Sequence, residues 1–156
     1  MGLESANYTL NYGKIEASQL VRVVQNLGGQ ENSDAPTGAR RFSIQGERYW
    51  IDLQWLAKSQ TGQPVIFIRV ALCNPLEVRE HLKQLFDQLF KSGDALMTDS
   101  RSKLQWHVWN DRSWEELWSS YQQQRSEFRK TFGNYEAAIS ADKVFENLQK
   151  HGNEPN

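Results

Sequence analysis

The sequence predicts an α+β fold, in which an antiparallel sheet packs against α-helices. Three observations lead to this prediction. Apolar and polar residues alternate through the range 41–72, which is typical of a three-stranded antiparallel meander. Apolar residues recur at helical spacing from Val78 and again from Trp114. Between these two helices, one or two further short strands are expected, and the last of them turns directly into the second helix.

Composition is that of a globular protein with one core. The 156 residues suffice for a single domain, expected over residues 1–150, with 151–156 as a disordered tail. A net charge of −1 gives no general attraction to nucleic acid or to acidic membranes. The one cysteine, Cys73, excludes an intrachain disulfide and suits a reducing compartment. Because the N-terminus has no secretory pattern and no apolar run is long enough to span a membrane, the cytoplasm is the expected location.

Before the meander, the pattern predicts a short strand and a helix. Tyr8–Tyr12 alternates as a strand does. Ser18 is the expected N-cap of a helix that runs to Leu27 and ends at a pair of glycines. The polar range 30–39, which contains both Pro and Gly, is expected to be a surface loop.

The meander itself is expected to consist of three strands, at 41–45, 49–56 and 65–72. Its alternation favours pairing Leu56 with Val65. This register places two more pairs opposite each other, Leu53 with Ile68 in the core and Asp52 with Arg69 on the other face. The side chains expected to face the core are those of Tyr49, Ile51, Leu53, Trp55, Ile66, Ile68, Val70 and Leu72.

A sharp helix start follows the meander. Asn74 is expected to cap this helix, with Pro75 at its first position and Glu77 at its third. The helix is expected to end at Gly93, and a short strand at 94–98 should follow. The apolar stripe of the helix consists of Val78, Leu82, Leu85, Phe86 and Leu89.

The range 103–121 holds four of the six tryptophans and changes from strand to helix period. In its strand part, alternation directs Leu104, Trp106 and Val108 to the core, and leaves His107 and Trp109 on the other side.

Ser113 is expected to open the longest helix through a capping box with Glu116. Arg125 interrupts the apolar stripe of this helix and should keep its charged head in water. A last helix is expected from Asn134, with Ala138, Ala141, Phe145 and Leu148 facing inward. The stripe of the longest helix consists of Trp114, Leu117, Trp118, Tyr121, Phe128 and Phe132.

No catalytic, metal or nucleotide motif stands out. Cys73 precedes a helix start, where a thiol can be activated, but no histidine base is expected nearby, so a buried structural cysteine is the favoured interpretation. The three histidines, at positions 81, 107 and 151, do not have metal-ligand spacing. The sequence therefore predicts a protein that is not an enzyme and has no cofactor or metal.

The second face of the sheet is the main functional candidate. Several large apolar residues are expected there, opposite the core face: Trp50, Leu56, Val65, Phe67 and Trp109. A contiguous aromatic patch is covered either by other elements of the fold or by a partner. The final helices are the favoured cover, and the alternative is a protein partner or a second copy in a homodimer. The candidate partner-binding residues are Trp50, Phe67, Arg69, His107 and Trp109.

Two other functions stay open. One is a small-molecule site or minor enzyme between the sheet and the Trp-rich range, with His107 and Cys73 as its polar groups. The other is RNA binding through the basic range 125–130, which the near-neutral charge of the chain disfavours.

The order of elements from Ser18 onward resembles that of class I type III secretion chaperones and of the related YbjN-like proteins. The segments that correspond are 20–27, 42–72, 75–90 and 104–109 running into 114–132. The resemblance implies protein binding through sheet and helix surfaces, often as a dimer and without enzymatic activity. An additional N-terminal strand and an additional C-terminal helix distinguish this chain from that family.

Overall fold

The computed structural model of the chain describes residues 5–12, 16–33, 35, 37–58, 62–91 and 94–133. These residues form an α+β fold, as the sequence predicts, and its seven strands include one, β2, that was not predicted. The strands are β1 (Ser5–Tyr12), β2 (Gln30–Asn32), β3 (Ala39–Gln45), β4 (Trp50–Leu56), β5 (Val65–Ala71), β6 (Ala95–Asp99) and β7 (Gln105–Trp106). The helices are α1 (Ala17–Asn26), α2 (Val78–Lys91) and α3 (Asp111–Phe132). Among these residues, no helix is long and apolar enough to cross a membrane.

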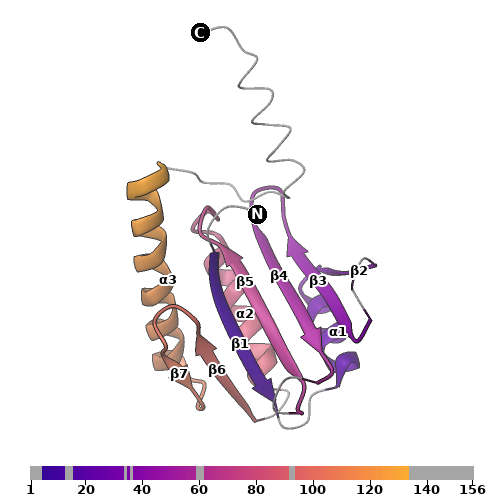
Figure 1. Cartoon of the computed structure of the whole chain (residues 1–156). Coiled ribbons are helices and arrows are strands. Elements are labelled where there is room, and N and C mark those ends of the chain that lie inside the picture. The colour runs from indigo at the N-terminus through magenta and orange to yellow at the C-terminus, as the bar shows by residue number, and fades with distance from the viewer. Residues whose placement is uncertain are drawn as a thin grey trace, which may run out of the picture.

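The strands form one antiparallel sheet in the order β2-β3-β4-β5-β1-β6-β7. The predicted meander is β3-β4-β5, and its register is confirmed, with Leu56 opposite Val65 and Leu53 opposite Ile68. The sequence did not indicate where the N-terminal strand lies. It occupies the middle of the sheet, between β5 and β6, and Figure 1 shows it there.

The core lies between the sheet and the helices. Tyr8 and Leu10 of β1 are fully buried, and the Tyr8 ring meets the Phe86 ring of α2 edge to face at 5.5 Å. Each buried Leu, Ile or Phe side chain stabilises the fold by about 1.5–3 kcal/mol relative to exposure. The alternate residues of β4 and β5 that were expected to face the core, such as Ile51, Ile68 and Val70, do so.

Helix α3 packs on the same side of the sheet as α2. The Tyr121 hydroxyl donates to the carbonyl oxygen of Ala71 at 2.8 Å, and Arg125 Nε donates to the carbonyl oxygen of Asn74 at 3.0 Å. The expected stripe is buried except for Phe132, which is 49% exposed at the helix end. Two expectations are therefore wrong: α3 does not cover the second sheet face, and the Arg125 head is buried against the 71–74 backbone instead of reaching water.

Helix α3 is further anchored through Asp99, the last residue of β6. The Asp99 carboxylate is fully buried and accepts hydrogen bonds from Ser120 Oγ at 3.1 Å and from Gln124 Nε2 at 3.2 Å. It also accepts from the backbone N–H groups of Arg101 and Ser102, at 3.0 and 3.4 Å. One carboxylate thus joins the β6–β7 turn to the longest helix.

Several helices and strands begin or end at residues other than those that the sequence predicts. Helix α1 is preceded by Glu16, whose N–H donates to Gln19 Oε1 at 3.1 Å, so Ser18 is not its cap. The polar range 30–39 contains the short edge strand β2 in addition to a loop. Helix α2 begins at Val78, after a turn, and the Asn74 side chain does not cap it but bonds the backbone of Trp50.

At the start of α3, Asn110 is the cap: its Oδ1 accepts from the N–H of Ser113 at 3.0 Å. The predicted strand around Trp106 is also shorter than expected, since only Gln105 and Trp106 pair with β6. Leu104 and Val108 were expected in the core but are 44% and 69% exposed. The predicted helix from Asn134 and the tail at 151–156 lie outside the described residues, as does the end of the predicted domain.

Candidate functional site

The sheet face that points away from the helices is the main candidate surface. Figure 1 shows α1 and α2 behind the sheet and α3 beside β6 and β7, with the opposite face toward the viewer. Among the described residues, no helix packs on that face. We call it the open face. It is formed by Asn7, Thr9 and Asn11 of β1, Arg41 and Ser43 of β3, Trp50, Asp52, Gln54 and Leu56 of β4, Val65, Phe67 and Arg69 of β5, and Leu96 and Thr98 of β6.

Phe67 lies near the centre of the open face. It is 41% exposed, and its cross-strand neighbours are Gln54 on β4 and Thr9 on β1. Arg69 follows two residues later on the same face and is exposed, opposite Asp52 and Asn7. No ion pair of Arg69 is found among the described residues. The centre of the face therefore offers an exposed ring beside an exposed cation.

Asp52 is the one carboxylate of the open face. The predicted position opposite Arg69 is confirmed, but its ion pair is with Arg41, whose Nη2 lies 3.7 Å from Oδ2. The Asp52 side chain is half-buried, and this burial raises its pKa, although Arg41 and Arg69 act in the opposite direction. Its negative charge is consequently held at a cost to stability.

Asp52→Asn is expected to stabilise the protein by about 1 kcal/mol at pH 7, because a neutral side chain loses less hydration there. The folded-state pKa of Asp52 is raised, so the contribution of this side chain to stability should fall as the pH rises from about 3 through that pKa. Urea unfolding of the natural protein and of the variant, at pH 7 and at about pH 3, measures the two stabilities. The advantage of the variant should be absent at the low pH, and an advantage of equal size at both would contradict the prediction.

Trp50 stands at the end of the open face and is held by its backbone. Asn74 is fully buried, its Oδ1 accepts from the Trp50 N–H at 2.8 Å, and its Nδ2 donates to the Trp50 carbonyl oxygen at 3.0 Å. The asparagine side chain thus pairs with β4 as a strand residue would. The sequence showed a helix cap at this position, and the long-range pairing left no local signal.

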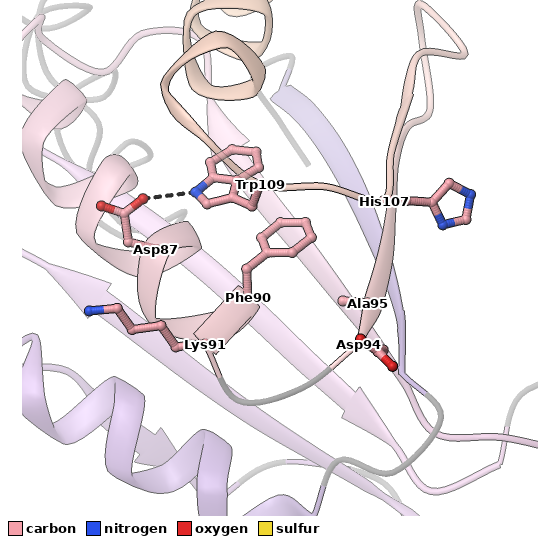
Figure 2. A pocket seen from close by; sticks show the side chains of 7 residues that line it. All are labelled: Asp87, Phe90, Lys91, Asp94, Ala95, His107 and Trp109. Atoms are coloured by element: carbon pink, nitrogen blue, oxygen red, sulfur yellow. Dashed lines mark hydrogen bonds between the residues drawn. The ribbon is translucent and has the colours of Figure 1, made fainter.

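Trp109 does not lie on the open face, contrary to expectation. Its ring stacks on Phe90 of α2 at 4.7 Å and meets Trp114 of α3 edge to face at 6.4 Å. Its Nε1 donates to Asp87 Oδ1 at 2.8 Å (Figure 2). The predicted alternation fails because the chain leaves the sheet after Trp106. Trp109 therefore belongs to the helix side of the molecule.

A shallow hollow of about 340 Å³ lies beside Trp109. Figure 2 shows the rings of Trp109 and Phe90 together on one side, while the His107 ring points away from them. This hollow lies where the sequence predicts a small-molecule site near His107 and Trp109, but the two side chains do not converge in it. The lining residues are Asp87, Phe90, Lys91, Asp94, Ala95, His107 and Trp109.

Cys73 is not part of this hollow. The side chain is 1% exposed, and burial raises the pKa of its thiol, with Arg125 as a weaker opposing influence. A buried thiol with a raised pKa stays protonated at neutral pH and is a poor nucleophile. The interpretation of Cys73 as a structural residue is thus favoured by its surroundings.

In the folded protein, Cys73 is expected to react with a chromogenic thiol reagent at least about a hundredfold more slowly than in urea, because reaction requires opening of a core. Absorbance after mixing measures the rate. Reaction of the folded protein at the rate of a free thiol would contradict this burial.

Metal ligands and a basic surface were also sought. Within the described ranges, no three His, Cys, Asp or Glu side chains lie close enough to hold a metal ion. Of the basic range predicted for RNA, Arg125 is buried in the protein and bonded to the Asn74 carbonyl. Arg101 forms an ion pair with Glu127 within this range, and Arg112, at the start of α3, forms one with Glu116.

Comparison of the chain with known proteins finds no relative. No protein-family model, curated protein or solved structure matches the chain, so its likeness in element order to the type III secretion chaperones stays a prediction.

Proposed function

We propose that this chain is a cytoplasmic, non-catalytic protein-binding domain of the chaperone or adaptor kind, and that the open face contacts the partner. The observation on which this rests is the placement of all three described helices on one side of the sheet. That placement leaves an exposed aromatic residue, Phe67, in the middle of the other side. Aromatic side chains are the usual energetic anchors of protein interfaces.

The chemistry of the open face supports a protein partner over a nucleic acid. The cross-strand neighbours of Phe67 are the uncharged polar residues Thr9 and Gln54, and Arg69 follows it on the same face of β5. An aromatic centre with polar surroundings is typical of protein interfaces. Two arginines, one of them paired with Asp52, supply too little positive charge for contacts to a series of phosphates.

The Trp109 hollow supports a ligand site less well. The Trp109 ring is stacked on Phe90 and its only polar atom is bonded to Asp87. Asp87 in turn is paired with Lys83 at 3.0 Å. A ligand would have to displace these contacts or bind beside them, whereas Phe67 and Arg69 need no rearrangement.

Phe67→Asp is expected to weaken association at least about thirtyfold, since loss of an interface anchor costs 2 kcal/mol or more. The circular dichroism spectrum should stay unchanged, because the side chain is exposed. Sedimentation of the purified protein measures self-association. Affinity capture, followed by binding of each identified partner in purified form, measures hetero-association.

Val108→Asp is the matched control, because Val108 is 69% exposed and lies away from the open face. It should bind as the natural protein does. If Phe67→Asp retains all association that the natural protein shows, the open face is not the binding surface.

A further inference from the structure

Strand β5 is the fourth of the seven strands and runs along the middle of the open face. Its first open-face residue, Val65, is buried and lies opposite the partly exposed Leu56 of β4. Phe67 follows and is 41% exposed, and Arg69 comes last and is exposed. The face therefore changes along β5 from apolar to aromatic to positively charged, over four residues or about 13 Å.

The positive charge of Arg69 is available to a partner. Asp52 lies directly opposite, but its ion pair is with Arg41, whose Nη2 lies 3.7 Å from Oδ2. The other cross-strand neighbour, Asn7, is uncharged. Two arginines and one aspartate give the open face a formal charge of +1, whereas the whole chain has −1. The centre of the face thus has the opposite sign to the chain and is complementary to a carboxylate.

The sheet topology indicates which secondary structure can lie on the face. The central strands β4, β5 and β1 each pair with a neighbour on both sides, so an additional strand cannot bond to them. A segment that covers them must satisfy its own backbone N–H and carbonyl groups, as an α-helix does. A helix is about 10 Å wide, which equals the distance of about 10 Å from β4 to β1.

The spacing of the β5 side chains also fits a helix. Two residues along a strand extend about 6.8 Å, and four residues along a helix about 6 Å. A helix with apolar, apolar and acidic residues one turn apart would therefore place them over Leu56, Phe67 and Arg69 in turn. Its flanks would meet the uncharged side chains of Gln54 and Thr9.

We propose that the partner of the open face is a different protein that presents an amphipathic helix with a carboxylate one turn from its apolar residues, and that Arg69 selects this carboxylate. The inference rests on the proposed function, because it takes the open face as the binding surface. Two copies of the face would bring surfaces of equal charge sign together, which disfavours a homodimer through this face. Because a covering helix excludes water, a wrong charge at Arg69 is penalised more than on an open surface.

Three synthetic helical peptides probe this selection. Each is alanine-based, with leucine at two positions one turn apart and one variable residue a turn further on, which is Glu, Gln or Lys. The Glu peptide is expected to bind the full chain at least about fivefold more tightly than the Gln peptide, and the Lys peptide most weakly. Fluorescence anisotropy of labelled peptides gives the affinities. Proton–nitrogen spectra should show shifts at Phe67 and Arg69 and none on α1 and α2.

Charge reversal tests the role of Arg69. Arg69→Glu should invert the order, so that the Lys peptide binds most tightly, and Arg69→Gln should abolish the difference between the Glu and Lys peptides. Circular dichroism should stay unchanged, since the side chain is exposed. Arg112→Glu is the matched control: it changes the net charge equally, but the side chain is 88% exposed on α3, and the order of the peptides should be kept.

The outcomes separate this inference from the proposed function. Equal affinities for the three peptides, absence of binding at millimolar concentration, or shifts mainly on the helices would overturn the acidic helix, while Phe67→Asp still decides whether the open face binds a partner. Self-association that Arg69→Glu abolishes would make a second copy the occupant and would also overturn it. If Phe67→Asp leaves the binding of the Glu peptide and of captured partners intact, the proposed function itself fails.

Discussion

Replacing Asp99 with alanine is expected to lower the free energy of unfolding by about 3–5 kcal/mol. The fully buried carboxylate accepts from Ser120 and Gln124 of α3 and from two N–H groups of the β6–β7 turn. Without it, Gln124 loses its acceptor in the buried interior, and the other donors lose theirs in partly buried positions. Urea unfolding followed by circular dichroism measures the loss.

Asp99→Asn and Asp94→Ala complete this test. Asparagine keeps one acceptor oxygen for the turn, so Asp99→Asn should lower the free energy of unfolding by less than Asp99→Ala does. Asp94 is exposed at the other end of β6, and its replacement should change stability by no more than about 0.5 kcal/mol. A loss below about 1 kcal/mol for Asp99→Ala would show that the anchor contributes little.

Asn74→Ala is expected to cost about 2–4 kcal/mol, since it leaves both the N–H and the carbonyl of Trp50 without their partner. The same change should shift the indole N–H signal of Trp50, which the asparagine positions at the end of the open face. Thermal or urea unfolding gives the stability, and a proton–nitrogen spectrum gives the shift.

Asn110→Ala is the matched control for Asn74→Ala. The same side-chain chemistry is removed, but Asn110 is an exposed helix cap, and its loss should cost about 1 kcal/mol. Equal losses of stability for the two variants would mean that the hydrogen bonds of Asn74 with β4 stabilise the protein no more than an exposed helix cap does.

The sequence predicted the elements that are determined by periodic patterns. Alternation in β4 and β5 gave the strand pairing to the residue, because a shift by one position would turn Ile51, Leu53 and Ile68 to the open face. Helical spacing likewise gave the buried stripe of α3 from Trp114 to Phe128.

The sequence did not predict what depends on contacts between distant residues. Asn74-Pro75 has the local pattern of a helix cap, yet the Asn74 side chain accepts a hydrogen bond from the backbone N–H of Trp50 in β4. Trp109 continues the alternation of Gln105 and Trp106, yet the aromatic surfaces of Phe90 and Trp114 hold it on the helix side. For the candidate site, Phe67, Arg69 and Trp50 therefore lie on one face as expected, whereas Trp109 lies on the helix side and His107 is exposed just after β7.

The middle position of β1 has a consequence for how the chain folds. The meander β3-β4-β5 pairs sequential neighbours and can form early, whereas β1 pairs with β5 and β6, which come much later in the chain. Although β1 precedes the other six strands in the chain, it is thus among the last to pair with both of its neighbours. Its apolar residues Tyr8 and Leu10 remain exposed to solvent until then. The slowest step of folding should therefore be the insertion of the N-terminal strand into a gap between two parts of the sheet that are otherwise complete.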